Sequence, residues 1–276
     1  MNYKYLILLA GMLLMACGDE DSSSVGPVNA SSAVESSTDN GGTNSSSSGK
    51  NSQKNSSSSV KKAEVVGGVL TDPRDGHEYP VMKTENQTWM AANLNYKVDS
   101  SWCYDDLAEN CEKYGRLYPW IVALQIDERY SENGWDFNVV LRNATNENHQ
   151  GVCPPGWHIP SMEEFDDLID YAYYNRFSNE AFCRLIKQDA WKSDLVDSSC
   201  AKFMEVDFDV LPAGKKDEYG TYTDMGQAAV FWSSNDLNSG GKKRSEAMGF
   251  YVGDVIGEEK SAAYVVSALS VRCVMD

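Results

Sequence analysis

The sequence predicts an α+β fold with about two main helices and several short antiparallel strands, preceded by a disordered serine-rich tether. Two observations separate the tether from the folded part. Residues 20–60 contain 16 serines, and no aromatic residue occurs between Tyr5 and Tyr79. Beyond the tether, short apolar runs broken by Gly, Asp and Asn surround a segment of helical periodicity, which is typical of mixed folds. All seven tryptophans lie between Trp89 and Trp232, so we expect the core there.

The charge of the chain argues against one class of partner. Its 276 residues include 41 acidic and 24 basic side chains, which gives a formal net charge of −17. Binding to a nucleic acid draws its affinity from clustered Lys and Arg side chains that displace counterions from phosphates. We therefore expect no nucleic-acid partner, and the same acidity disfavours an anionic membrane surface.

Residues 1–16 have the pattern of a secretory signal peptide. Lys4 is followed by the apolar run Leu6–Met15, which is too short to cross about 30 Å of hydrocarbon as a helix. The run leads into a Leu-Met-Ala-Cys sequence that ends at Cys17 and resembles the lipobox of bacterial lipoproteins. The resemblance implies that Cys17 becomes a lipidated N-terminus, with a diacylglyceryl thioether on its sulfur and an acyl chain such as palmitate on its amine. The partner of this anchor is the lipid of the outer membrane.

Residues 17–64 form the expected linker between lipid and domain. Its composition cannot bury enough apolar surface to offset the entropy of ordering, so we expect disorder. A flexible chain of roughly 40 residues has a mean reach of about 35 Å. The acidic residues Asp19, Glu20 and Asp21 resemble the surface-export signal of some Gram-negative lipoproteins, although a solvated linker would also carry them. The expected location is the outer membrane, with the domain exposed at the cell surface.

Residues 65–276 form the expected domain, and local patterns predict its elements. Val69–Met90 predicts strands joined by a turn at Asp75-Gly76. Ser161 and Glu164 form a capping box followed by an apolar stripe at helical spacing, so the main helix begins at Ser161. Shorter helices are expected at Tyr118–Gln125 and Asn179–Lys187, and further strands at Phe208–Leu211, Ala228–Ser233, Ala247–Val252, Ala262–Val266 and Ser270–Val274.

Six cysteines remain once Cys17 is assigned to the lipid. An even number in an exported chain predicts three disulfides, which can pair in about 15 ways. Proximity in the sequence favours Cys103 with Cys111 and Cys183 with Cys200, which leaves Cys153 with Cys273. The alternative is a metal site, but no Cys-x-x-Cys pair occurs and the three histidines share no ligand spacing, so zinc is not expected.

Several sequence blocks together resemble a known family. The most specific block is Cys-Pro-Pro-Gly-Trp-His at 153–158, and the others are Asp75-Gly76, Asn86–Tyr96, Tyr114–Trp120, Leu211–Gly214, Phe231–Ser234 and Val271–Val274. In this order they resemble the Fibrobacter succinogenes major paralogous domain, over about Gly68–Asp276. That family is similar to the C-type-lectin-like group and to formylglycine-generating, sulfatase-modifying domains. The resemblance also supports the pairing of Cys153 with Cys273, but it implies no particular activity.

Candidate ligand contacts are few, and each has a structural alternative. His158 precedes the main helix and could act as a general base, but a structural histidine bonded to the backbone is the favoured interpretation, since no Ser, Cys or Asp partner can be assigned. Trp102 and Trp135 lie next to a disulfide loop and a turn, where exposed indoles can stack on sugar rings. Trp89, Trp120, Trp157 and Trp232 fall inside the family blocks, so we assign them to the core.

Calcium is a weaker expectation. Asn235 and Asp236 follow a predicted strand and resemble the Trp-Asn-Asp motif of calcium-dependent lectins, with the spacing wrong by two residues. Asp105 and Asp106 form a second acidic pair inside the predicted Cys103–Cys111 loop. A solvated turn explains either pair without a metal. We expect no other cofactor.

These observations favour a non-catalytic, surface-tethered module that binds extracellular polysaccharide or another surface protein. No catalytic residue is assigned. One alternative is a protein-modifying enzyme related to the formylglycine-generating domains, which would need reactive cysteines or a bound metal. The other is a structural scaffold in an envelope assembly.

Overall fold

The computed structural model describes residues 61–126, 149–173, 179–191, 193–236, 244–253 and 256–276. All of them belong to one compact unit of the chain, which begins at Ser57. The signal peptide, Cys17 and most of the linker therefore lie outside the described residues. The last residues of the expected linker, from residue 61 onward, belong to the described domain. Ala63 donates a backbone hydrogen bond to Pro155, and the first strand begins at Glu64.

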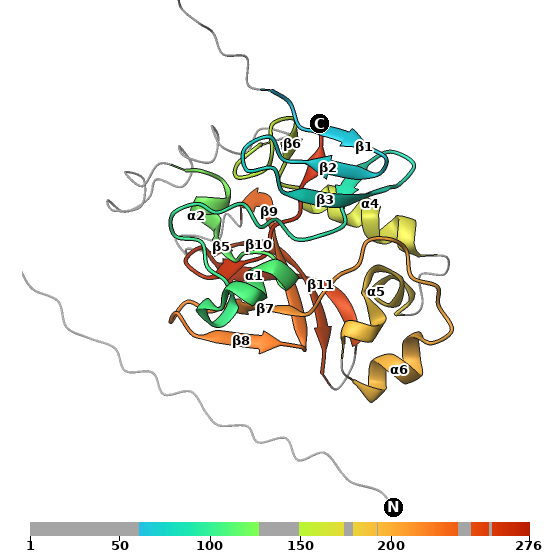
Figure 1. Ribbon diagram of the computed structural model, residues 1–276. Coiled ribbons are helices and arrows are strands. Elements are labelled where there is room, and N and C mark those ends of the chain that lie inside the picture. The colour runs from blue at the N-terminus through green and yellow to red at the C-terminus, as the bar shows by residue number, and fades with distance from the viewer. Residues whose placement is uncertain (1–60, 127–148, 174–178, 192, 237–243, 254–255) are drawn as a thin grey trace, which may run out of the picture. The chain divides into compact units, whose positions relative to one another are not determined.

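The described strands form two sheets that are mostly antiparallel (Figure 1). The first sheet contains, in spatial order, β1 (Glu64–Val66), β2 (Val69–Thr71), β3 (Glu78–Lys83), β4 (Thr88–Met90), β13 (Val274–Met275) and β6 (Trp157–His158). The second contains β11 (Ile256–Tyr264), β10 (Arg244–Val252), β9 (Ala228–Asp236), β7 (Ala213–Lys216), β12 (Ala268–Leu269) and β5 (Tyr118–Pro119), with β8 (Tyr222–Met225) paired to β7. Only the β7–β9 pairing within these sheets is parallel among the described strands.

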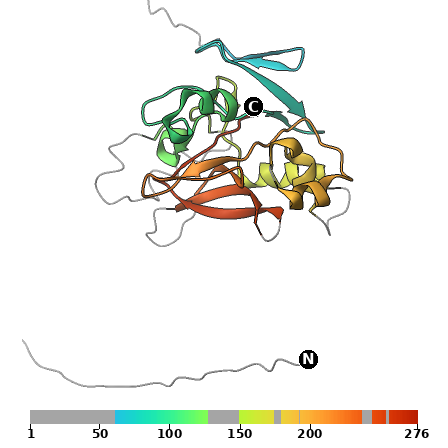
Figure 2. The ribbon, with the colours of Figure 1, turned by 60° about the horizontal axis from the view of Figure 1, so that its bottom comes forward.

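The described helices are short. They are α1 (Ala108–Tyr114), α2 (Trp120–Ala123), α4 (Met162–Ala172), α5 (Glu180–Leu185) and α6 (Asp194–Cys200), with 3-10 turns η1 (Tyr104–Asp106) and η3 (Gln188–Ala190). Helices α4, α5 and α6 gather on one side of the long strands, and α1 and α2 lie on the other (Figures 1 and 2). In the described part of the chain, no helix has the length and apolar character needed to cross a membrane. The mixed fold with few helices and antiparallel sheets agrees with the sequence.

The main helix begins as the sequence predicted. The side chain of Ser161 accepts a hydrogen bond from the backbone of Glu164, and the carboxylate of Glu164 accepts one from the backbone of Ser161. Phe165 and Leu168 then face the core and are fully buried. The capping box satisfies backbone donors that have no partner within the first turn of a helix.

Other predicted elements differ from the structure because of long-range pairing. Tyr118–Gln125 was expected as one helix, but Tyr118 and Pro119 pair with Leu269 and Ala268, so α2 begins only at Trp120. Phe208–Leu211 is not a strand and makes a single bridge, between Val210 and Ile186. Three boundaries also differ from the prediction. Helix α5 is shorter than the expected Asn179–Lys187, and β11 ends at Tyr264 instead of Val266. The expected strand Ser270–Val274 is paired only from Val274 onward, apart from a bridge at Ser270.

The core is aromatic and forms two main clusters. One packs α4, α5 and α6 against the sheets through Trp89, Phe165, Phe182, Phe231 and Phe250, among others. The other surrounds Trp120, Trp157 and Trp232. The prediction that the four tryptophans of the family blocks are structural is confirmed, since each is at most 1% exposed.

Three disulfides link Cys103 to Cys111, Cys153 to Cys273 and Cys183 to Cys200. These are the pairs that the sequence favoured. The Cys153–Cys273 bond spans 120 positions and joins the segment before the main helix to the last strand of the first sheet. Closing so long a loop stabilises a fold by about 4 to 5 kcal/mol in the chain-entropy account.

A fully buried arginine precedes the last of these cysteines. Arg272 donates from Nε to the Asn93 side chain at 2.8 Å, and its two Nη atoms donate to the carbonyls of Phe208 and Asp209. Its guanidinium also lies over the ring of Phe208, 4.4 Å from the centroid. Burial lowers the pKa of Arg272 to about 9, with Asp209 opposing the shift, so the group remains charged at neutral pH.

Replacing Arg272 with Lys tests this arrangement. A lysine keeps the charge but donates from a single nitrogen, which cannot reach three separate acceptors. Since each buried acceptor left unpaired costs about 1 to 3 kcal/mol, we expect Arg272→Lys to lower the free energy of unfolding by about 2 to 4 kcal/mol. Urea denaturation with the disulfides intact measures the change. Arg184→Lys is the matched control at a partly exposed arginine, and equal losses in the two variants would contradict the prediction.

His158 connects the start of the main helix to the C-terminal residue. Its Nε2 lies 2.8 Å from a Glu164 oxygen and its Nδ1 lies 2.8 Å from an Asp276 oxygen. Burial acts to lower the pKa of His158, but the hydrogen bonds to Glu164 and Asp276 outweigh it and raise the pKa above its ordinary value. The pKa of Glu164 is lowered, because its bonds to His158 and Ser161 outweigh the effect of burial. The two shifts favour an imidazolium paired with carboxylate.

The stability of the domain should therefore depend on pH through His158. His158 contributes its full stabilisation to the folded state at pH values below its ordinary pKa of 6.5. This stabilisation is lost as the pH rises through the raised pKa that His158 has in the folded protein. Glu164 contributes its full stabilisation at pH values above its ordinary pKa of 4.5. This stabilisation is lost as the pH falls through the lowered pKa that Glu164 has in the folded protein. We expect the stability advantage of the wild type over His158→Gln to be largest near about pH 5 to 6 and to shrink toward about pH 9.

Denaturation curves across this pH range measure that difference, with His77→Gln as the control at a histidine outside the network. A difference between wild type and His158→Gln that stayed constant over the range would show that the charge of His158 contributes nothing.

Candidate functional site

A pocket of about 590 Å³ lies beside Trp102, between the loop that leads to this residue and the β5–α2 segment. Its volume falls within the range of small-ligand sites, about 300 to 1,000 Å³. Most of the side chains that line it are apolar, and the described lining residues are Val98, Asp99, Ser100, Trp102, Pro119, Ile121, Val122, Gln125, Ile126, Val152 and Val266. Polar side chains come only from Asp99, Ser100 and Gln125 among these residues.

The loop that carries Trp102 is held by hydrogen bonds along its length. Trp102 and Leu117 exchange two backbone hydrogen bonds of 3.0 and 2.9 Å. Arg116 donates from Nη1 to the Ser101 carbonyl at 3.2 Å, and the Ser101 hydroxyl donates to the Val98 carbonyl at 2.6 Å. The Cys103–Cys111 disulfide closes the chain directly after Trp102. This wall of the pocket is therefore formed before any ligand arrives.

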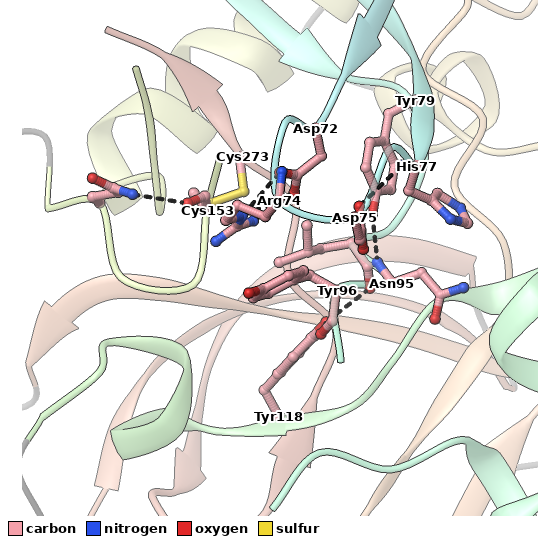
Figure 3. Close-up of polar contacts among 12 residues, drawn as sticks. Asp72, Arg74, Asp75, His77, Tyr79, Asn95, Tyr96, Tyr118, Cys153 and Cys273 are labelled. Carbon is pink, nitrogen blue, oxygen red and sulfur yellow. Dashed lines mark hydrogen bonds and ion pairs between the residues drawn. A yellow bond between two sulfur atoms is a disulfide. The ribbon is translucent and has the colours of Figure 1, made fainter. Parts of the chain in front are cut away.

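The start of the same loop is fixed by a charge pair from the first sheet (Figure 3). Asp72 is fully buried and accepts hydrogen bonds from Nε and Nη2 of Arg74 at 2.9 and 2.6 Å. The Arg74 guanidinium in turn stacks over the ring of Tyr96, 3.7 Å from the centroid. The hydroxyl of Tyr118 donates to the Tyr96 carbonyl at 2.7 Å, and burial raises the pKa of Tyr118, which keeps this donor protonated. The N-terminal strands thus help to position the pocket.

The opposite wall depends on close contact between α2 and the segment before Cys153. Val152 donates a backbone hydrogen bond of 2.8 Å to Ala123. Gly151 permits this approach, because a Cβ at that position would lie 2.2 Å from the Ala123 carbonyl oxygen. The Cys153–Cys273 disulfide follows immediately and secures the segment to the core.

Trp102 is half-buried, and one face of its indole is covered. The ammonium of Lys216 lies 4.3 Å from the ring centroid and 4.8 Å from that of Tyr222. The hydroxyl of Tyr222 donates to Asp106 at 2.7 Å. A ligand in the pocket can therefore meet only the remaining face or the edge of the indole.

Strained backbone is concentrated around this pocket. Among the described residues, six that are not glycine have a positive φ, and Ser100 (59°) and Gln125 (51°) line the pocket. Asp105 and Asp106 (55° and 56°) follow shortly after Trp102. Left-handed conformations of such residues are uncommon and tend to occur at functional sites.

Among the other predicted ligand contacts, Asn235 is placed by the structure and does not line this pocket. Trp135 lies outside the described residues. Asn235 accepts a hydrogen bond of 2.7 Å from the backbone of Met162, so it helps to cap the main helix. The expected turn at Asn235 and Asp236 is in fact the end of β9, which extends to Asp236. The side chain of Asp236 is outside the described part of the structure.

The calcium candidates have other surroundings. Asp105 and Asp106 are exposed, and Asp106 accepts the hydrogen bond from Tyr222 described above. Across the described residues, no three His, Cys, Asp or Glu side chains are grouped so that they could hold a metal ion. His158 has both ring nitrogens within hydrogen-bond distance of carboxylates, so neither is free to accept a proton from a substrate.

The sequence identified Trp102 but not the residues opposite it. Ile121, Val122 and Val266 come from segments with no motif of their own, and only the fold brings them to Trp102. A cluster of aliphatic residues in a short helix is the usual pattern of a core, so no sequence signal marked these residues as pocket lining.

Comparisons with known proteins agree with the family expectation. The family described as the Fibrobacter succinogenes major domain matches residues 82–275, well over half of the chain. No curated protein and no solved structure matches the chain. The chain belongs to the Fibrobacter succinogenes major domain family.

Proposed function

We propose that the chain is a surface-tethered lipoprotein whose domain, of the C-type-lectin-like group, binds extracellular polysaccharide or another surface protein without catalysing a reaction. The observation that carries this proposal is the pocket beside Trp102, whose walls are held by two disulfides, a buried charge pair and backbone pairing. Preformed walls lower the entropy that a ligand must overcome on binding. A domain joined to the lipid through the expected linker could reach partners beyond the lipid surface.

A protein-modifying activity has less support. Chemistry of the formylglycine-generating type would require reactive thiols or a bound metal. The three disulfides use all six cysteines that follow Cys17. No observation in the described structure favours the scaffold role over binding.

The anchor can be tested by replacing Cys17 with Ser. We expect the wild type to partition with the outer membrane and Cys17→Ser to lose this partition, because the mutant cannot carry the thioether-linked diacylglycerol. Membrane fractionation and labelling with a fatty-acid analogue measure the two effects, and protease shaving of intact cells reports surface exposure. Retention of Cys17→Ser in the membrane fraction, still labelled, would contradict the lipoprotein assignment.

The pocket can be tested with a panel of glycans and insoluble polysaccharides, and with surface-protein extracts, each with and without calcium. We expect Trp102→Ala to reduce retention of the bound partner by about tenfold or more, because a buried aromatic contact contributes more than about 1.4 kcal/mol. Tyr219→Ala is the matched control, since Tyr219 is 85% exposed and lies outside the pocket. Equal effects of the two substitutions would contradict a role for the pocket.

A further inference from the structure

The chemistry of the pocket wall distinguishes between possible ligands. Eight of the described lining residues are apolar and three are polar. A sugar ring carries hydroxyl groups around its edge, and each one that is buried without a hydrogen-bond partner costs about 1 to 3 kcal/mol. Aliphatic side chains such as Ile121 and Val122 provide no such partner, whereas they suit the apolar side chains of a polypeptide.

The apolar surface also continues outward from the pocket. Val266 is one of its lining residues and is 55% exposed, in the turn between β11 and β12. Its exposed part extends the apolar wall of the pocket to the surface of the domain. A small ligand enclosed by the pocket would leave this side chain in water.

Charged side chains of both signs lie around the pocket: the ammonium of Lys216 lies over one face of Trp102, whereas the segment that begins at Asp99 is acidic. The segment 99–112 contains five carboxylates, on Asp99, Asp105, Asp106, Glu109 and Glu112, and no Lys or Arg. Asp99 lines the pocket itself. A partner with positive charge beside its apolar residues would complement this rim. A second copy of the chain, with a net charge of −17, would be repelled.

We infer that the pocket beside Trp102 binds apolar side chains of a polypeptide segment flanked by Lys or Arg. The inference rests on the proposed binding function and narrows its ligand to one class. The apolar side chains enter between Trp102 and α2, while a flanking cation lies against Asp99, the carboxylate of the pocket lining. Polysaccharide binding and self-association at this surface are the competing outcomes.

Three synthetic peptides test the inference on the full chain in nonionic detergent, by fluorescence polarisation. The first is Lys-Lys-Leu-Phe-Val-Lys-Lys, the second replaces its lysines with Glu, and the third replaces Leu-Phe-Val with Ser-Gly-Ser. We expect the first to bind at least about tenfold more tightly than either of the others. The advantage over the acidic peptide should decrease as salt screens the charges.

Single substitutions separate the apolar and the electrostatic contributions. Val266→Ser should lower the affinity for the first peptide by about threefold or more. Val66→Ser is the control, at another valine that is 73% exposed on β1. Asp99→Asn should reduce the preference for the basic over the acidic peptide by about 1.5- to fivefold. Asp207→Asn, at an exposed carboxylate outside the pocket, is its control.

Three other results would overturn the inference, and each can be told apart from the others. Binding of the first peptide weaker than about 1 mM, together with polysaccharide retention that depends on Trp102, rejects the polypeptide ligand and leaves the proposed function standing. Dimerisation that Val266→Ser abolishes would assign the surface to self-association. Absence of peptide, polysaccharide and surface-protein binding would reject both the inference and the proposed function.

Discussion

The buried charge of Arg272 joins parts of the domain that are far apart in the sequence. A guanidinium removed from water is tolerated only if its donors are paired, and here the partners come from two separate segments, at Asn93 and at Phe208 and Asp209. Asn93, one of those partners, also donates to Tyr114 and Ser270. The chain around Asn93 leads directly to Tyr96 and the pocket loop. The position of that loop is thus connected to a charge in the core through the Asn93 side chain and the few residues of chain that follow it.

The same constraint explains the unusual course of the chain near Arg272. Segment 270–273 passes between the sheets: Val271 and Cys273 accept backbone hydrogen bonds from Leu94 and Met90, and Ser270 accepts one from Trp232. This explains why the segment does not form one continuous strand. The carbonyls of this segment thus accept hydrogen bonds from both sheets, from Met90 in the first and Trp232 in the second, and the segment carries the buried arginine and the disulfide cysteine. Both core clusters contact this segment, so the sheets and the helices share one interior.

What the sequence could predict depended on the range of the interactions. The capping box of Ser161 and the pairing of nearby cysteines are local, and the structure contains both. Tyr118 and Pro119 were expected in a helix because their neighbours are apolar, but their partners lie about 150 positions away in β12, and no local pattern reveals that pairing. Trp102 was identified as an indole beside a disulfide loop, whereas Ile121 and Val266 become part of its pocket only through tertiary contacts. Asn235 resembled a ligand residue because its role as a cap for α4 is visible only across the fold.

The Cys153–Cys273 bond also has a mechanical consequence for a domain that is pulled on. Load applied at Lys61 reaches β1 first, and β1 has only three residues paired to β2, from the Glu64–Thr71 pair to the Val66–Val69 pair. Such an antiparallel pair opens one hydrogen bond at a time when it is pulled from its end. Cys153 and Cys273 are 120 positions apart and covalently linked. The distance between them therefore cannot increase under load unless a covalent bond breaks. The domain therefore combines a short strand pair at its N-terminal side that opens easily with a disulfide-closed segment that cannot extend.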